Sequence, residues 1–522
     1  MDRSTRPRGP RGRDGAALFP FEFRSIDGRG NNLEHADWGA AETALLRTMT
    51  PAYGDGVDSP AGPQRPSARA ISNIVSAQSG SLPNPLRASD FVWQWGQFLD
   101  HDLDETPVAD PAQPFDIPVP IGDAWFDPMR TGSVTISLDR SGYRVVDGVR
   151  QQVNLITAFL DASNVYGSDD ARATELRSLD GTGRLKTSAD GLLPYNLRGF
   201  ANAPTSDDAK YFLAGDIRAN EQVGLTAMHT LFVREHNYWA DAVRAAIPSL
   251  DGRLIYEISR TIVVAEMQAI TYREFLPLLL GPNAIPPYRG YLPRVDSGIA
   301  NIFATAAYRV GHTMLSPQIL RLEADGSMHA LGALPLAEAF FNPDELSATG
   351  IDPILRGLAF QRAQAVDPFV VDDVRNFLFG PPGAGGFDLV ALNIQRGRDH
   401  GLPTYNDVRQ RVVNDRTRSF AELTPDPDIR ARLSEAYGDV DDIDAWVGLL
   451  AEPRARDAMV GRTLQRVLTE QFVRLRDGDR FWYESYLPPD YVQFIHTQLL
   501  SVIIRRNTSI GAELPHDVFR VR

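Results

Sequence analysis

The sequence predicts a mainly α-helical protein, a single large domain with long loops and little β-structure. Apolar residues recur at helical spacing over 225–243, and segments 254–275 and 299–314 look helical too. Only 134–138 and 143–146 look like paired strands, which we expect to form a hairpin. No repeat and no internal linker divides the chain, and long loops without secondary structure suggest a functional scaffold.

The ends of the chain are expected to differ from the domain between them. Residues 1–20 are basic with no apolar segment behind them, so they read as a disordered tail and not as a secretory signal. The domain is expected to span 21–522 and to begin with an extended arm, 21–88, rich in Gly, Pro, Asn and Ser. Short helices are expected at 38–48 and 491–504.

Composition excludes several classes of protein. The net charge of −14 argues against nucleic-acid binding, which needs a basic surface. No apolar run reaches the length of a transmembrane helix. The chain has no cysteine, which excludes disulfides, zinc–thiolate sites, iron–sulfur clusters and thiolate-ligated haem. With no signal peptide, we expect a cytoplasmic protein or one secreted by a route other than the general one.

An apolar run that turns abruptly acidic, 91–104, is the most informative stretch. Gln97 and His101 lie four residues apart and therefore share one face of a helix. Asp100 and Asp102 flank the histidine. Burying so many polar groups is costly unless a ligand, metal or cofactor satisfies them, so this helix is expected to form one wall of an active site.

A second cluster is the oxygen-rich segment 157–163. Thr157, Asp161 and Ser163 lie close together in sequence, and calcium takes six to eight oxygen ligands. Asp102 would be a natural further ligand. A turn capped by its own side chains is the alternative interpretation.

Two further clusters carry arginine beside a carboxylate or a histidine. Arg218 and Glu221 precede the helix at 225–243, although they could be a surface pair. His312 ends an apolar helix beside Gly311, which indicates a close approach by a flat ligand or by another helix. Arg309 could meet an anionic edge of such a ligand.

The last cluster, 392–401, follows an apolar stretch. Asn393 could accept the Nδ1 proton of a metal-ligating histidine, a contact that tunes the ligand. Arg396 could pair with a propionate. A capped, solvated turn is the alternative for this stretch on its own.

Together these clusters resemble the peroxidase–cyclooxygenase superfamily, the haem peroxidases of the myeloperoxidase and lactoperoxidase type. The matching stretches come in the family's order and cover nearly the whole chain: 23–32, 95–104, 159–168, 212–218, 228–237, 311–313, 392–396, 398–403 and 479–482. So many colinear matches are far more specific than any one of them. Because it lacks cysteine, the chain resembles a bacterial-type member of this superfamily.

The resemblance implies a role for each matching residue. His101 corresponds to the distal histidine, with Gln97 as its halide-side neighbour and Arg218 as the distal arginine. His312 corresponds to the proximal iron ligand, with Asn393 behind it.

The resemblance also implies how the cofactors are held. Asp100 and Glu221 match the two carboxylates esterified to haem b, but Gln222 stands where members with a sulfonium link have methionine. The residues that match the family's calcium ligands are Asp102, Thr157, Phe159 (through its carbonyl), Asp161 and Ser163.

The implied activity is reduction of hydrogen peroxide with oxidation of halides, thiocyanate or phenolic donors by a monomeric haem peroxidase. One alternative is a fatty-acid dioxygenase on the same fold, and another is a non-catalytic haem-binding adhesion or matrix protein. Dioxygenases place a radical tyrosine three residues before the proximal histidine, where this chain has Arg309. Tyr308, one residue earlier, is expected to point away from the substrate channel.

Overall fold

The computed structural model describes residues 22–205 and 208–521, and the predicted tail, residues 1–20, lies outside them. The described chain is mainly helical with three small antiparallel sheets, as the sequence predicts. Its α-helices of eight or more residues are α1 (Ala68–Val75), α2 (Phe91–Leu103), α5 (Val223–Ala246), α6 (Gly252–Ile270), α10 (Asp352–Phe360), α12 (Leu389–Asp399), α13 (Tyr405–Val413), α15 (Pro427–Tyr437), α17 (Arg462–Asp477) and α20 (Leu500–Asn507).

Short helices fill the connections. The short α-helices are α3 (Ser163–Tyr166), α4 (Asp170–Leu176), α7 (Leu276–Leu280), α8 (Leu336–Ala339), α9 (Pro343–Thr349), α11 (Asp372–Arg375), α14 (Phe420–Leu423), α16 (Ala445–Ala451), α18 (Tyr483–Tyr486) and α19 (Pro489–Ile495). Two π-helical turns, η1 (Thr271–Phe275) and η2 (Phe303–Ala307), and two 3₁₀ turns, η3 (Tyr308–Thr313) and η4 (Val440–Asp442), complete the helical structure.

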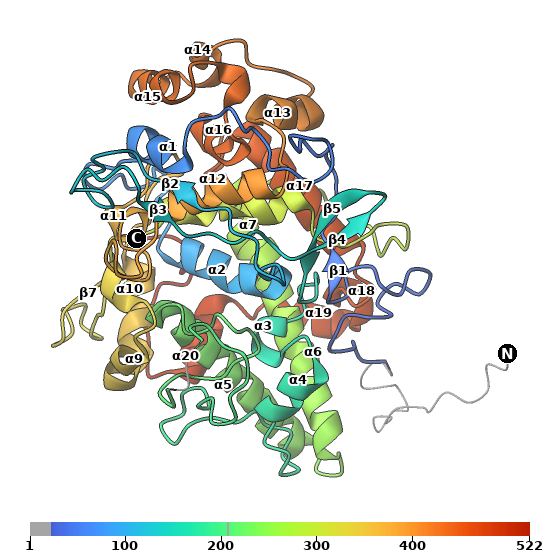
Figure 1. Cartoon of the computed structure of the whole chain (residues 1–522). Helices are drawn as coiled ribbons and strands as arrows, with labels where there is room; N and C mark the ends of the chain where they lie inside the picture. The colour runs from blue at the N-terminus through green and yellow to red at the C-terminus, as the bar shows by residue number, and fades with distance from the viewer. Residues whose placement is uncertain (1–21, 206–207, 522) are drawn as a thin grey trace.

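Helix α2 lies in the middle of the molecule, with α12 and α17 on one side of it and α5 and α6 on the other (Figure 1). Its apolar face packs on α5, where the Phe98 ring stacks on Phe232 with centroids 5.1 Å apart. Trp95 contacts the same Phe232 ring at 5.8 Å and is fully buried. The apolar half of the sequence 91–104 therefore fixes α2 in the core and leaves its acidic end beside polar neighbours.

The strands pair differently from the expected hairpin. β4 (Tyr143–Val146) pairs with β5 (Val149–Asn154), and β5 pairs with β1 (Thr43–Ala44). The turn between β4 and β5 is Asp147-Gly148, both with positive φ, which is the strongest short hairpin signal in a sequence. The expected strand at 134–138 is shortened to β3 (Thr135–Ile136), which pairs with β2 (Ile117–Pro118); β6 (Gln318–Ile319) pairs with β7 (Leu334–Pro335).

Two expected helices are wrong. Residues 38–48 form turns and β1, because Gly39 and Glu42 have positive φ and Thr43 pairs with Asn154. The expected helix at 491–504 is two helices, α19 and α20, separated by a turn at 496–499. The expected helices at 225–243 and 254–275 are confirmed as α5 and as α6 continued by η1.

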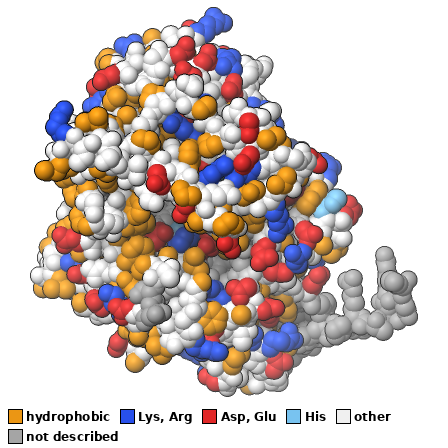
Figure 2. Space-filling view, in the orientation of Figure 1, with side chains coloured by type: hydrophobic (Ala, Val, Ile, Leu, Met, Phe, Trp, Pro, Cys, Tyr) orange, Lys and Arg blue, Asp and Glu red, His pale blue; other side chains and the backbone are white. Residues whose placement is uncertain are grey.

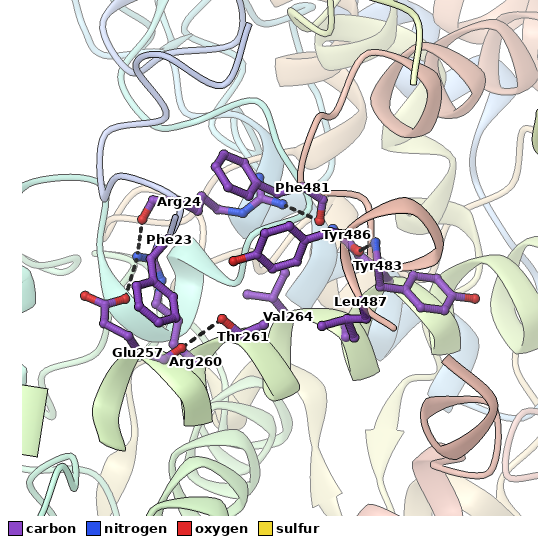
Figure 3. Close-up of a pocket in the computed structure, with 12 residues that line it drawn as sticks. Phe23, Arg24, Glu257, Arg260, Thr261, Val264, Phe481, Tyr483, Tyr486 and Leu487 are labelled. Carbon is purple, nitrogen blue, oxygen red and sulfur yellow. Dashed lines mark hydrogen bonds and ion pairs between the residues drawn. The ribbon is translucent and has the colours of Figure 1, made fainter. Parts of the chain in front are cut away.

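The arm reaches across to the far end of the chain. Arg24 donates to Asp479 at 2.8 Å, and Arg260 of α6 donates to the Arg24 carbonyl at 2.9 Å. Figure 3 shows Arg24 and Arg260 around a small pocket, together with Phe481 and Tyr486. Because these groups are buried, the arm is part of the packed domain and not a loose extension.

Candidate active site

A cavity of about 440 Å³ lies where α2, the segment before α5, the η2–η3 turn and α12 meet. That volume is in the usual range for ligand pockets, and we call it the central cavity. Most of the residues expected at a haem site line it, namely Gln97, Asp100, His101, Arg218, Glu221, Arg309, His312 and Arg396. Four segments far apart in sequence therefore bring one set of polar groups to one space.

His101 is buried on α2 with each ring nitrogen near a carboxylate. Its Nδ1 lies 3.6 Å from Asp216 and makes no hydrogen bond, and its Nε2 lies 3.9 Å from Glu221. Burial, helped by the charge of Arg218, holds the pKa of His101 well below its usual value. A neutral imidazole at the cavity wall can accept a proton, which is what a general base requires.

Arg218 is held by a carboxylate that the sequence analysis did not single out. Asp216 accepts hydrogen bonds from Nε (2.9 Å), Nη2 (2.8 Å) and the backbone N–H (2.8 Å) of Arg218. Asp216 is 2% exposed, and Arg218 keeps its pKa well below the usual range. The sequence did contain a clue to this contact, because Asp216 stands two residues before Arg218 in the matching stretch 212–218.

Glu221 joins α2 to the start of α5 through amide side chains. Gln97 donates to Glu221 at 3.0 Å, and Gln222 donates to Gln97 at 3.0 Å and to Gln94 at 2.7 Å. Gln222 also caps α5, because its side-chain oxygen accepts from Gly224 N–H at 2.6 Å. Gln222 stands where members with a sulfonium link to haem have methionine, and its side chain is hydrogen-bonded to Gln94, Gln97 and Gly224 instead.

The two carboxylates expected to carry ester links face the cavity on either side of His101. Burial raises the pKa of Glu221 to about 7 and that of Asp100 to about 6. Asp100 is also 3.8 Å from Arg218, whose charge opposes the shift.

His312 lines the central cavity from η3. Burial lowers its pKa to about 3, with a further contribution from the charge of Arg309, so the imidazole is neutral at pH 7. A Cβ added at Gly311 would meet no atom within 4 Å. No described helix therefore packs on this glycine, and the close approach expected there is open to a ligand.

Asn393 of α12 contacts His312. Its amide nitrogen lies 2.8 Å from Nδ1 of His312, and its oxygen accepts from Arg309 at 3.1 Å. A histidine that binds metal through Nε2 carries its proton on Nδ1. The predicted role therefore needs the amide turned over, so that its oxygen and nitrogen trade places.

Two further side chains, Arg396 and Tyr308, line the central cavity. Arg396 donates to the Ser141 hydroxyl (2.8 Å) and to Asp399 (3.1 Å). Tyr308 also lines the cavity, although we expected it to point away from where the radical tyrosine of the dioxygenases reaches the substrate channel. That expectation used α-helical rotation, whereas the chain changes from a π to a 3₁₀ turn at Tyr308, where residue spacing around the axis differs.

The oxygen-rich segment 157–163 lies directly behind α2. Ser163 donates to Asp102 (2.8 Å) and Thr157 donates to Asp161 (2.9 Å). Both carboxylates are fully buried, each has a raised pKa because burial disfavours its charge, and Asp161 Oδ2 has no hydrogen-bond partner. Phe159, in the same segment, is also fully buried. The described residues bring together no group of three acidic or histidine side chains there, so a cation would depend on hydroxyl and carbonyl oxygens.

The residues present fit a haem. Neutral His312 offers a nitrogen ligand, Gly311 leaves the approach open, and Arg309 and Arg396 supply cations for acidic substituents. Apolar side chains from several elements complete the lining: Phe275, Leu279, Leu315, Leu336, Phe340, Leu378 and Leu392. His101 and Arg218 line the same space.

The visible face of the molecule mixes acidic, basic and hydrophobic side chains without a continuous basic stripe (Figure 2). In residues 22–205 and 208–521, no helix combines the length and apolar character needed to cross a membrane.

Comparison with known proteins gives one consistent result. Residues 23–519 match the model of a family described as animal haem peroxidase. Peroxinectin A of Dictyostelium discoideum is 35% identical over 520 residues, covering 96% of each chain. Thyroid peroxidase of Sus scrofa is 34% identical and covers 96% of this chain, which spans 60% of that protein.

Solved structures agree. Peroxidase A from Dictyostelium discoideum superposes with a TM-score of 0.89 at 33% identity, covering 96% of this chain and 99% of that one. A fatty acid α-dioxygenase from Oryza sativa superposes with a TM-score of 0.80 at 21% identity, covering 96% of this chain and 87% of that one, a likeness of fold alone.

Proposed function

Since this chain belongs to the animal haem peroxidase family and is a haem-dependent peroxidase, we propose that it oxidises halides, thiocyanate and phenols in the central cavity. The observation that carries the proposal is that neutral His101, cationic Arg218 and neutral His312, from three different segments, line the same cavity. Haem held by these residues would supply the iron at which peroxide is reduced and which then takes electrons from the donor.

His101 moves the proton of the substrate. Its Nε2 takes a proton from hydrogen peroxide and returns it to the departing oxygen, which leaves as water. Its Nδ1 keeps a proton directed at Asp216, 3.6 Å away, so that Nε2 stays available. The low pKa of His101 supports this role, because the imidazole remains a base over the whole neutral range.

Arg218 supplies fixed positive charge. Two hydrogen bonds from its side chain to Asp216 hold the guanidinium at the cavity wall, where it stabilises the negative charge that develops on the departing oxygen. Small anions are favoured in the same place, which supports halide and thiocyanate as donors.

His312 is proposed as the iron ligand and Asn393 as the group that holds its Nδ1 proton. Turning the Asn393 amide over presents its oxygen to Nδ1 and its nitrogen to Arg309. Two donors then face each other, which favours a shift of the Arg309 guanidinium toward an acidic substituent of the haem; Arg396 is proposed to meet another.

Two finer features complete the proposal. Asp100 and Glu221 would hold haem b through ester bonds to two of its methyl groups, each replacing one C–H bond in a two-electron oxidation for which hydrogen peroxide is the oxidant. Their position in the cavity and their raised pKa values support this role. A calcium ion bound by Asp102, Thr157, the Phe159 carbonyl, Asp161 and Ser163 ties α2 to the following loop. The buried pair Asp102 and Asp161 supports it, because a cation would compensate two charges in a site closed to water.

The test is a comparison of His101→Ala, Arg218→Ala and the native protein, each loaded with haem. Peroxide-dependent oxidation of iodide, bromide, thiocyanate and a phenol should be rapid in the native protein and largely lost in both variants. His312→Ala should lose haem or change the Soret band grossly. Rapid oxygen uptake with linoleate, abolished in Tyr308→Phe, would instead establish a fatty-acid dioxygenase.

A further inference from the structure

The hydroxyl of Tyr308 is a buried polar group without a partner. Tyr308 is 6% exposed, lines the central cavity and makes no hydrogen bond through its hydroxyl. Buried tyrosine and tryptophan normally satisfy their polar atom, and an unsatisfied group in a packed protein calls for an explanation such as a redox role. Phenylalanine would pack in this place without leaving a hydroxyl unsatisfied.

The Tyr308 ring begins a series of edge-to-face contacts that leads away from the cavity. Its centroid lies 5.7 Å from that of Phe472 on α17, and Phe472 lies 6.1 Å from Tyr272 in η1. The Tyr272 hydroxyl donates to the carbonyl of Phe472, so a hydrogen bond joins the same two residues. Tyr272 lies 4.7 Å from Trp482.

The series ends at the surface. Trp482 is 1% exposed, its Nε1 has no partner, and its ring lies 6.0 Å from Tyr288. Tyr288 is partly exposed, and its hydroxyl bonds to the hydroxyl of the exposed Ser485. We call Tyr308, Phe472, Tyr272, Trp482 and Tyr288 the aromatic path.

The surroundings of the outer end favour an aromatic donor. Tyr288 is partly exposed, and Ser485, which its hydroxyl contacts, and the neighbouring Arg289 are exposed. Arg476 lies over the Tyr288 ring at 5.3 Å and is paired with Asp477 at 2.8 Å, so its charge is compensated. An accessible aromatic ring of this kind can stack against the ring of a phenol.

We propose that the aromatic path conducts electrons from a bulky aromatic donor at Tyr288 to the haem site, giving the protein a second place of oxidation at its surface. The proposal rests on the haem peroxidase activity but not on which small donor uses the central cavity. It adds a class of substrate, phenols carried on molecules too large to enter that cavity.

The electron balance closes with two donors for each peroxide. Each phenol gives one electron to Tyr288 and releases its proton to solvent. Trp482, Tyr272 and Tyr308 each pass on one electron and regain one, so the path returns to its starting state. Hydrogen peroxide receives two electrons and two protons and leaves as two water molecules.

The primary experiment traps the radical on the path. The haem-loaded protein is treated with one equivalent of hydrogen peroxide and the spin trap DMPO, without a donor, and adducts are located by peptide mass spectrometry. We expect an adduct on Tyr288, lost in Tyr308→Phe and in Trp482→Phe. Tyr256→Phe is the matched control, because Tyr256 also has a buried, unpartnered hydroxyl but lies off the path. The Tyr256→Phe variant should still form the adduct on Tyr288.

The second measurement does not depend on Trp482→Phe folding. Tyr288→Phe changes a partly exposed residue, so we expect peroxide-dependent oxidation of phenol-bearing dextran to be lost while iodide oxidation is unchanged. The proposal is overturned if the native protein gives no adduct on Tyr288, if the adduct survives in a folded Trp482→Phe variant, or if Tyr288→Phe oxidises phenol-bearing dextran at the native rate. Unchanged iodide oxidation in those cases would leave the peroxidase function intact.

Discussion

An oxygen of Asp216 lies 3.6 Å from Nδ1 of His101, so a small movement would bring the two atoms within hydrogen-bond distance. The same carboxylate accepts three hydrogen bonds from Arg218. One buried acidic group therefore holds Arg218 and lies close to Nδ1 of His101.

Asp216→Asn should slow the reaction with hydrogen peroxide while haem remains bound. Hydrogen bonds to charged groups contribute about 1.5–3 kcal/mol, so we expect a loss of roughly ten- to a hundredfold in the second-order rate constant. Stopped-flow absorbance measures it. Asp170→Asn, a surface change on α4, is the control, and a native rate in Asp216→Asn would remove the carboxylate from this role.

The ester links are tested by extracting haem. After peroxide cycling, acid–organic solvent should leave haem on the native protein, release part of it from Glu221→Gln or Asp100→Asn, and release all of it from the double variant. Glu105→Gln is a matched control, because Glu105 also lines the central cavity and its pKa is also raised by burial. Full extraction from the native protein would refute the links.

Calcium is tested by removing it. Chelation should lower the melting temperature of the native protein, because a ligand at about a hundred times its Kd contributes roughly 3 kcal/mol to folding. Asp102→Asn should bind calcium more weakly and respond less to the chelator. Elemental analysis that finds no calcium in active protein would contradict the site.

Asp90 gives a prediction about pH. It begins α2, is 1% exposed and accepts from Ser316 at 2.8 Å, and burial raises its pKa from 3.8 to about 8. An acid whose pKa is raised in the folded state holds a proton that the unfolded state has lost. Its contribution to stability is present below pH 4 and is lost as pH rises toward 8.

The free energy of unfolding of Asp90→Asn should therefore rise relative to that of the native protein as pH rises, by about 1.4 kcal/mol per pH unit within that window. Chemical denaturation at several pH values between 4 and 8 measures the difference. Asp190→Asn, an exposed change, should show no such trend, and a pH-independent difference for Asp90→Asn would show that its carboxyl does not titrate in this window.

Periodicity was enough to predict the fold where packing follows it. The stripe through Leu225, Met228 and Phe232 gave α5, since all three are buried. The strand expected at 143–146 is β4, but its partner β5 was missed because the sequence of β5 carries no apolar alternation, so the turn between them, Asp147-Gly148, was the informative signal.

The site was less predictable where tertiary contacts decide it. His101, Arg218 and His312 were found through motifs, and the structure brings them to one cavity. Asp216 was overlooked because its value comes from contacts with Arg218 and His101. That Tyr308 lines the cavity was not predicted, because no periodic pattern announces a π turn followed by a 3₁₀ turn.

The bond between Arg24 and Asp479 joins residues 455 positions apart. Arg24 also lies over the Phe159 ring at 5.6 Å, and Gln268 links Asp479 to the Leu160 carbonyl. During synthesis, the contacts that Asp479 makes with Arg24 and Gln268 therefore form only after nearly the whole chain has left the ribosome. Until then, the loop behind α2 lacks these contacts. Contacts of such long range form late, so we infer that the cavity wall formed by α2 is completed after synthesis, and that nascent chains truncated before Asp479 leave it unfinished.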